Sequence, residues 1–266
     1  MITVIIPTLN EEEHIAYVVN FAKSQPNVTE VIVVDDKSQD ETARIALENG
    51  ARVITSTKLG KGVSMKEGIQ CASNDIVAFL DGDIEPYPFY TIKLLTDPII
   101  SGEADFVKAS FSRNAGRVTE LVAKPLLSIF FPDLSKFNQP LSGMIAGRRD
   151  MLDKIDFSDD YGVDIGILID MYLMNARVRE VEIGYIENKS KPWHALGKMS
   201  REVSQAIIKK AAGSNNPHFN FEELGALNEI RSQLEYALSS NMRGLEKLII
   251  FDMDNTILHN SFITTL

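Results

Sequence analysis

The sequence predicts an α/β protein with a mainly parallel sheet flanked by helices. Apolar runs of strand length alternate with segments of helical periodicity from residue 2 to residue 80, as in parallel strands joined by crossover helices. The runs end in acidic or polar residues, at the edge of the sheet where α/β proteins bind ligands. With 266 residues, 44% of them hydrophobic, the chain can bury a large core.

The first two strand–helix units follow directly from the pattern. Val4–Ile6 forms the first strand, and Pro7 is expected to end it. The helix that follows has apolar residues at helical spacing: Ile15, Val18, Val19 and Ala22. Val31–Val34 forms the second strand, which leads through Asp36 to a helix around Ala46. Acid therefore stands at the end of the second strand.

The next two strands bring further polar residues to the same edge. Ala51–Thr55 is predicted as a strand and is followed by a helix that ends at Ala72. Ile76–Leu80 is the fourth strand, and it stops at Asp81 and Asp83, which one glycine separates. Two carboxylates at a strand end suit a divalent cation that carries phosphate, so Mg²⁺ or Mn²⁺ is expected. An Asp-Gly turn between two strands is the ordinary alternative.

A basic glycine turn, Lys58–Gly62, precedes the third helix. It lacks the spacing and the Ser or Thr of a P-loop, which excludes an ATPase of that type. A plain turn is one interpretation. Because the turn lies on the same edge as the acid pair, Lys61 is instead expected to face a phosphate or a sugar.

Composition excludes several classes of function. The net charge of −10 argues against a nonspecific nucleic-acid binder. Cys71 is the single cysteine, so no disulfide framework or thiolate metal cluster is expected, and a cytoplasmic location is predicted. No apolar run reaches the length of a membrane span, so no membrane partner is expected.

Four blocks in the first half resemble nucleotide-sugar glycosyltransferases of the GT-A fold. In order, they are Ile6–Glu12, Val33–Ser38, Gly60–Gly62 and Asp81–Asp83. The resemblance implies a Rossmann-like GT-A fold with a C-terminal helical extension and a nucleotide-diphospho-sugar donor. It places Asp36 near the base or ribose and Pro7 and Glu11 along the nucleoside. Asp83, together with Asp81, is implied as a ligand of the metal on the diphosphate.

Five segments of the second half resemble glucosyl-3-phosphoglycerate synthases. They are Gly116–Pro125, Gln139–Gly143, Ala146–Arg149, Tyr161–Asp170 and Leu196–Ser200. With them, the resemblance covers about residues 2–210. It implies that Arg117 and Thr119 bind the phosphate of a small phosphorylated acceptor, and it adds Gly82, Gly116 and Tyr161 to the donor site. A guanidinium with a neighbouring hydroxyl suits a phosphate; a solvated helix residue is the alternative for Arg117.

Three departures from that family's pattern concern the sugar and the metal. Met144 and Asp164 stand where the family usually has glutamate. The family takes a third metal ligand, a histidine, from the stretch before Leu196–Ser200. His194 is the candidate here, although Asn188 lies nearer in register, and an ordinary surface histidine is the alternative.

Three regions are predicted along the chain. Residues 1–212 form the GT-A glycosyltransferase domain, which Lys198–Ala212 closes with an amphipathic helix. Residues 213–246 form a linker and a second amphipathic helix, which packs on the enzyme or on a second subunit as in a homodimer. Residues 247–266 resemble the start of a haloacid-dehalogenase-type phosphatase, and Asp252 and Asp254 match its opening motif. These 20 residues are too short for such a domain, so no phosphatase activity is expected from them, and a longer bifunctional parent is predicted.

The leading prediction is a metal-dependent hexosyltransferase. It moves glucose or mannose from a nucleotide diphosphate to 3-phosphoglycerate or a similar small phosphorylated hydroxy acid, with retention of configuration as the resemblance implies. Asp83, Lys61 and Asp164 are its predicted catalytic residues, of which Lys61 and the metal offset charge on the leaving diphosphate. A sugar-phosphate nucleotidyltransferase and a non-catalytic nucleotide-sugar-binding module are the two alternatives.

Overall fold

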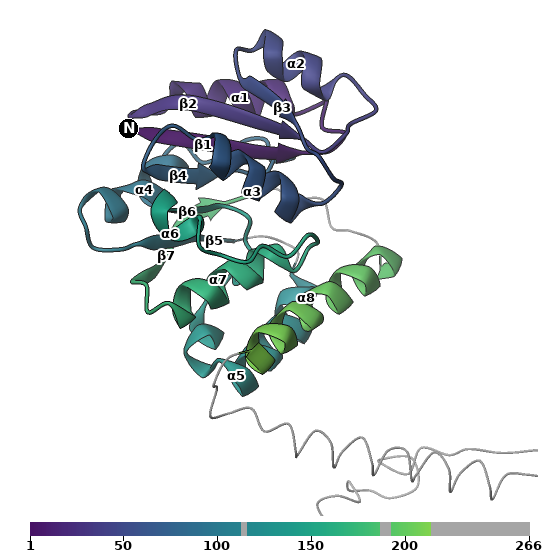
Figure 1. The fold of residues 1–266 in the computed structure, drawn as a ribbon, viewed down its shortest axis with the longest axis vertical. Coiled ribbons are helices and arrows are strands. Elements are labelled where there is room, and N and C mark those ends of the chain that lie inside the picture. Colours follow the sequence, from purple (N-terminus) through teal and green to yellow (C-terminus); the bar gives the residue numbers. More distant parts are fainter. Residues whose placement is uncertain (113–115, 187–192, 214–266) are drawn as a thin grey trace, which may run out of the picture. The chain divides into compact units, whose positions relative to one another are not determined.

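The computed structural model describes residues 1–112, 116–186 and 193–213 (Figure 1). These residues belong to one compact unit, Met1–Phe219. The predicted linker, second helix and phosphatase-like start span residues 213–266. All of these residues except Gly213 lie outside the described residues. No helix in the described ranges is long and apolar enough to cross a membrane.

A mixed seven-stranded sheet forms the centre of this unit, with the strand order β3-β2-β1-β4-β6-β5-β7 (Figure 1). Its strands are β1 (Ile2–Thr8), β2 (Val28–Asp35), β3 (Arg52–Thr55), β4 (Ile76–Phe79), β5 (Phe106–Ser112), β6 (Ile145–Arg148) and β7 (Val178–Tyr185). The first four strands pair in parallel, and β5 pairs in parallel with β7. Only β6 runs antiparallel to both of its neighbours. The predicted mainly parallel sheet is confirmed.

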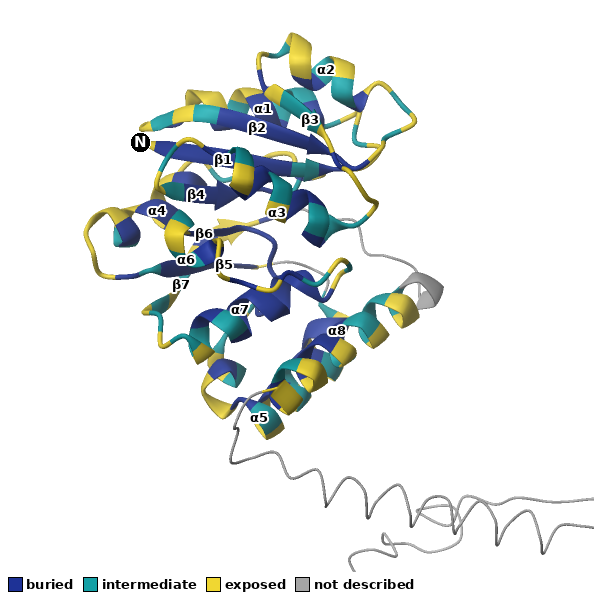
Figure 2. Ribbon diagram, in the orientation of Figure 1, coloured by how far each residue is buried: buried dark blue, intermediate teal, exposed yellow. Residues whose placement is uncertain are grey.

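Helices cover both faces of the sheet (Figure 1). They are α1 (Ile15–Ser24), α2 (Thr42–Glu48), α3 (Lys61–Cys71), α4 (Thr91–Ile100), the π-helix η1 (Thr119–Ala123), α5 (Lys124–Phe130), the 3₁₀ helix η2 (Pro132–Lys136), α6 (Arg149–Leu152), α7 (Val163–Leu173) and α8 (Trp193–Gly213). Alternate strand residues face opposite sides. Val4 and Val33 pack in one cluster with α1, α2 and α4, whereas Ile5 and Val34 pack with α3 and α5–α8. The central strands are therefore buried on both faces (Figure 2).

Two helices confirm the predicted periodicity. All four apolar residues predicted for the first helix are buried in α1. In α8, Val203, Ala206 and Ile207 are buried, and Met199 is half-buried against the same core. The helix begins at Trp193, five residues before the predicted start at Lys198.

The prediction that Pro7 ends the first strand is wrong. β1 continues to Thr8, and Pro7 pairs with Val34 of β2. In a parallel sheet, successive residues of a strand form hydrogen bonds with the neighbouring strands on alternate sides. The Ile5 carbonyl oxygen accepts from the Leu80 N–H, on the β4 side. Pro7 therefore faces the β4 side, but pairing with β4 stops at Ile5. Its missing N–H falls where no strand needs a donor.

Candidate active site

Lys61 joins two carboxylates at the carboxyl edge of the sheet. Its Nζ donates to Asp81 Oδ1 at 3.1 Å and to Asp164 Oδ2 at 2.9 Å. All three residues were predicted for the site, although they are as far as 103 positions apart in the sequence. The structure therefore brings the predicted cation and two of the predicted acids into one ion-paired group.

Glycines allow the segment that carries Lys61 to approach α7. Gly60 has a φ of +144°, and a Cβ atom on it would lie 2.3 Å from the Asp159 carbonyl oxygen. A Cβ atom on Gly62 would lie 1.7 Å from the Ser158 carbonyl oxygen. Only glycine fits at both places, because any side chain would overlap backbone. This contact brings the first residue of α3 to the first turn of α7, and thus Lys61 to Asp164.

Lys61 is charged, and Asp164 keeps one carboxylate oxygen that no protein group bonds to. Burial opposes the charge on Lys61, but the attraction of Asp164 and Asp81 outweighs it and raises the pKa of Lys61 above its usual value. Lys61 is therefore cationic at neutral pH. Asp164 is 6% exposed, and its Oδ1 is buried without a hydrogen-bond partner in the protein. A buried carboxylate oxygen of this kind calls for a donor from a ligand or from water.

Gly143 borders the same group and was missed as a site residue. A Cβ atom on Gly143 would lie 2.4 Å from Asp81 Oδ1 and 2.6 Å from Lys61 Nζ. The register explains this approach: Phe79 of β4 pairs with Ile145 of the antiparallel β6, so the residue two places after Phe79 lies beside the residue two places before Ile145. Only the pairing of β4 with β6, which the sequence pattern did not predict, reveals this contact.

The Asp81–Asp83 turn is held from both sides. Tyr87 Oη donates to the Asp81 carbonyl oxygen at 2.7 Å. On the other side, Gly82 is packed so closely that a Cβ atom on it would lie 2.8 Å from Thr8 Cγ2 and 3.6 Å from Glu11 Cγ. The turn therefore sits directly on the end of β1 and the segment that follows it, as predicted for a shared edge.

Negative charge accumulates beside this turn. Burial first, and then the charge of Asp83, raise the pKa of Glu11 to about 7, with a smaller contribution from Asp81. An excess of carboxylate charge next to an Asp-Gly-Asp turn fits a divalent cation, which prefers such oxygen donors. No group of three His, Cys, Asp or Glu side chains in the described part of the chain is arranged to hold a metal. Asp81 and Asp83 would therefore hold the ion together with ligands from outside this set, such as the diphosphate.

Asp36 directly follows β2 and contacts Gly60, the residue before α3. Its two carboxylate oxygens accept from the Gly60 N–H at 3.1 and 2.9 Å. Asp36 thus supports the turn that carries Lys61, whatever it contributes to a nucleoside. The Pro7 carbonyl oxygen would also lie 3.7 Å from a Cβ atom on Gly82. These contacts bring seven predicted residues together at one edge: Pro7, Glu11, Asp36, Lys61, Asp81, Gly82 and Asp164.

Asp83 lies in the turn after β4, beside Gly82, and the other five predicted residues lie on three segments around this edge. Gly116, with a φ of +143°, and the exposed Arg117 precede η1, and the buried Thr119 begins it. Tyr161 is 39% exposed and lies two residues before α7. His194 lies in the first turn of α8, but its side chain is outside the described residues. The roles of these five residues, like those of the residues gathered at the edge and of Asp83, stay predictions.

The departure at Met144 does not remove a group from the site. The Met144 side chain is fully buried in the cluster that packs α1 and α4, and its backbone oxygen accepts from the Ala109 N–H at 2.9 Å. Asp164, the other departure, still pairs with Lys61. The shorter acid therefore keeps its place in the ion-paired group.

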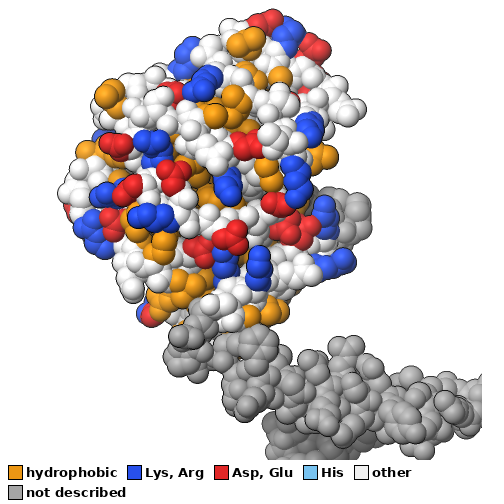
Figure 3. Space-filling model, in the orientation of Figure 1, with side chains coloured by type: hydrophobic (Ala, Val, Ile, Leu, Met, Phe, Trp, Pro, Cys, Tyr) orange, Lys and Arg blue, Asp and Glu red, His pale blue; other side chains and the backbone are white. Residues whose placement is uncertain are grey.

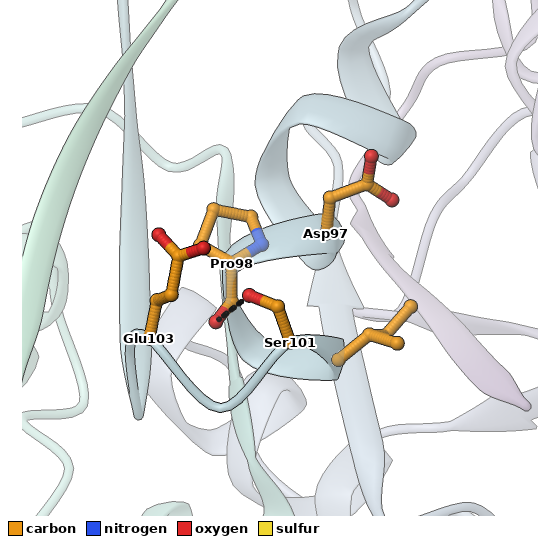
Figure 4. Close-up of a pocket in the computed structure, with 5 residues that line it drawn as sticks. Asp97, Pro98, Ser101 and Glu103 are labelled. Carbon is orange, nitrogen blue, oxygen red and sulfur yellow. Dashed lines mark hydrogen bonds between the residues drawn. The ribbon is translucent and has the colours of Figure 1, made fainter.

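A surface pocket elsewhere is separate from this site (Figure 4). It is lined by Asp97, Pro98, Ile100, Ser101 and Glu103. Ser101 Oγ donates within it to the Pro98 carbonyl oxygen at 3.2 Å. The segment lies between the end of α4 and the amino end of β5, which is the opposite edge of the sheet from Asp81.

Acidic and basic side chains alternate over most of the surface visible in Figure 3, whereas acids outnumber lysine at the site. Acidic and basic side chains are interspersed over the face in Figure 3, and they form surface pairs such as Arg44 with Glu48 and Lys93 with Asp97. Such exposed pairs contribute little stability. At the site, by contrast, a single cation, Lys61, faces two carboxylates, those of Asp81 and Asp164.

Comparison with known proteins agrees with this geometry. Residues 3–155 match the family described as Glycosyl transferase family 2. The glucosyl-3-phosphoglycerate synthase of Petrotoga mobilis is 35% identical over 236 residues, which cover 79% of this chain and 73% of that protein. The enzyme of the same name from Mycobacterium tuberculosis is 35% identical over 237 residues, with the same coverage.

Solved structures give the same result. The Mycobacterium tuberculosis enzyme in complex with Mn²⁺, uridine-diphosphate-glucose and phosphoglyceric acid matches with a TM-score of 0.76 and 34% identity, over 80% of each chain. Its complex with Mg²⁺ and uridine diphosphate matches with a TM-score of 0.75. The chain has the GT-A fold and belongs to the glucosyl-3-phosphoglycerate synthase family of nucleotide-sugar-dependent glucosyltransferases.

Proposed function

We propose that this chain transfers glucose from UDP-glucose to the hydroxyl group of 3-phosphoglycerate, with retention of configuration and with Mg²⁺ or Mn²⁺ as cofactor. The relatives support the substrates, because structures of the Mycobacterium tuberculosis enzyme hold Mn²⁺ with UDP-glucose and phosphoglyceric acid, or with UDP and glucosyl-3-phosphoglycerate. The family membership of the chain supports the reaction class.

The observation that carries the proposal is the state of Asp164. One of its oxygens is fixed by Lys61 at 2.9 Å, and the other is buried without a partner in the protein. A sugar hydroxyl would supply the missing donor, and a buried hydrogen bond to a charged group contributes about 1.5 to 3 kcal/mol. We therefore assign Asp164 to the sugar of the donor.

Lys61 acts on the leaving group in this proposal. Breaking the glycosidic bond leaves negative charge on the diphosphate, and a fixed cation stabilises that charge without having to reorganise. Lys61 is held in place by Asp81 and Asp164 and stays protonated, so it provides such a cation. A divalent ion held by Asp81 and Asp83 would add Lewis-acid stabilisation of the same oxygens.

The acceptor site is assigned to the start of η1. Arg117 is exposed and Thr119 begins the helix, so a guanidinium and a hydroxyl lie within one turn. The phosphate of the acceptor accepts hydrogen bonds from both groups. Gly116, whose φ of +143° favours glycine, allows the chain to turn just before them.

A product assay tests the proposal. The protein is incubated with UDP-glucose, 3-phosphoglycerate and Mn²⁺, and we expect UDP and a phosphorylated glucoside by mass spectrometry. Release of pyrophosphate instead would indicate a nucleotidyltransferase. Binding of UDP-glucose with no turnover in the presence of either metal would indicate a binding module. Activity that resists a chelator would remove the metal from the mechanism.

The tail suggests a consecutive step. Asp252 and Asp254 belong to a motif that resembles the start of a phosphatase, and the acceptor of the first reaction carries a phosphate. We infer that a phosphatase domain, in a longer form of this protein, would hydrolyse the phosphorylated glucoside. The cytoplasmic location and the homodimer also stay predictions from the sequence.

A further inference from the structure

Lys108 is a fully buried lysine of β5 that the proposed reaction does not use. It is 0% exposed, and it lies on the same face of the strand as Phe106, toward the core that contains α7. Its Nζ donates to the Ser142 carbonyl oxygen at 2.8 Å and to the Asp164 carbonyl oxygen at 3.0 Å. A buried amine is costly for a fold, so its retention calls for a reason.

Both acceptors belong to segments that touch Lys61. Ser142 immediately precedes Gly143, where a Cβ atom would overlap Asp81 and Lys61. Asp164 holds Lys61 through its carboxylate. One side chain thus bonds to the backbone of the loop on one side of Lys61 and to the first turn of α7 on the other.

We propose that Lys108 is a positioning residue: it holds the Ser142–Gly143 backbone and the first turn of α7 at a fixed separation, so that Asp81 and Asp164 both reach Lys61. This inference rests on the proposed function for the role of that group. Its two acceptors are carbonyl oxygens, so Lys108 fixes backbone and leaves both carboxylates to Lys61 and the ligand.

The ionisation of Lys108 agrees with this role. Burial lowers the pKa of its amine to about 8, against the attraction of Asp164. The ammonium has three donors and the neutral amine has two. Because only two acceptors need donors, both forms can keep the two backbone segments together.

Hydrogen exchange tests the positioning without turnover. In Lys108→Met, which keeps the apolar part of the side chain but loses its terminal amine, we expect the amides of 142–144 and 163–166 to exchange at least tenfold faster, while those of Val4–Ile6 keep their rates. Ile145→Val is the control, since it removes one methylene from the partner of Lys108 in β6. Unchanged rates at 142–144 and 163–166, or an equal acceleration over the whole chain, would overturn the proposal.

Kinetics test the consequence for the site. A displacement of about 1 Å at a reacting group costs about a hundredfold in rate, so we expect kcat of Lys108→Met to fall at least tenfold. Ile145→Val should keep kcat within twofold. A kcat of Lys108→Met within twofold of the unmodified protein would contradict the proposal.

The two proposals fail separately. If the unmodified protein transfers no glucose, the proposed function is wrong, and hydrogen exchange still decides the role of Lys108. If Lys108→Met does not fold, Lys108→Gln replaces it in both experiments, because its shorter amide retains a donor but cannot span both acceptors. The same ordering of rates is then expected, and the same results would overturn it.

Discussion

Gly143 lies directly against Asp81, so close that a Cβ atom on Gly143 would come within 2.4 Å of Asp81 Oδ1. The same atom would come within 2.6 Å of Lys61 Nζ. Neither group can move away without losing the ion pair between them, which has an N–O distance of 3.1 Å. The loop before β6 therefore forms a wall of the site. The ion pair between Lys61 and Asp81 requires glycine at position 143, because a side chain there would overlap both groups.

We expect Gly143→Ala to lower kcat at least tenfold with little change in folding. The added methyl group displaces Lys61 or Asp81 by a few tenths of an ångström or more, and small displacements at a reacting centre are costly. Steady-state kinetics and thermal unfolding would measure the two effects. Gly197→Ala is the matched control, because a Cβ atom at that position in α8 meets nothing within 4 Å. Equal kcat values for the two variants would contradict the requirement for glycine at position 143.

Asp83→Ala is expected to abolish metal-dependent turnover while the protein stays folded. Asp83 is an exposed residue of the turn after β4, so its removal leaves the core intact. Asp81→Ala should weaken donor binding as well, since it also removes a partner of Lys61. Asp75→Ala is the control, because Asp75 is a fully exposed acid immediately before the same strand, at its opposite end. Activity of Asp83→Ala equal to that of the control would end the metal assignment.

Arg117→Ala should raise the KM for 3-phosphoglycerate about ten- to a hundredfold, because a hydrogen bond to a charged group contributes about 1.5 to 3 kcal/mol. The KM for UDP-glucose should change little. Arg44→Ala, at an exposed position of α2, controls for the loss of one surface charge. If the unmodified protein used glycerate as well as its phosphate ester, the acceptor assignment would be wrong.

Stability at low pH should depend on Asp105. Arg177 donates to both of its carboxylate oxygens, at 2.9 and 2.8 Å, and these hydrogen bonds lower the pKa of Asp105 from 3.8 to about 2. A lowered pKa stabilises the fold above the unfolded value near 4, and this contribution disappears as the pH falls through about 2. Arg177 is 56% exposed, so solvent screening limits the effect to on the order of 1 kcal/mol.

Urea unfolding of Asp105→Asn measures this contribution. We expect the variant to be less stable than the unmodified protein at pH 7, and the difference to shrink between pH 4 and pH 2. Glu103→Gln, which breaks an exposed pair with Arg179, should change stability much less. A difference for Asp105→Asn that stays constant from pH 7 to pH 2 would show that the ion pair is not its cause.

The first half of the fold could be predicted because its strands are Val- and Ile-rich and buried on both faces. The four predicted residues of α1 are all buried, and Lys61 meets the strand-end acid Asp81 as expected. β6 was not predicted, because Ile145–Arg148 is short and has no alternation; its place depends on pairing with β4 and β5. A lysine in a strand usually indicates an exposed position, so Lys108 had no signal in the sequence.

In the site, too, the contacts that depend on tertiary packing could not be predicted from the sequence pattern. Lys61 and Asp81 follow from strand order, since both stand at the carboxyl edge. The approach of Asp164 depends on Gly60 and Gly62 packing against the loop before α7, which is a tertiary contact. Resemblance to a family supplied Asp164 where periodicity gave nothing.

The last prediction concerns the phosphate of the product. The acceptor keeps its phosphate during glycosyl transfer, because the bond formed is to its hydroxyl group. The sequence predicts that Asp252 and Asp254 resemble the opening motif of a phosphatase, and that chemistry also requires a metal site and a basic residue from other segments. We therefore expect the 266-residue chain to accumulate the phosphorylated glucoside, with no inorganic phosphate above background. Asp252→Asn should leave the amount and identity of this product unchanged. Steady release of phosphate that Asp252→Asn abolishes would instead show that the tail is catalytic in this form.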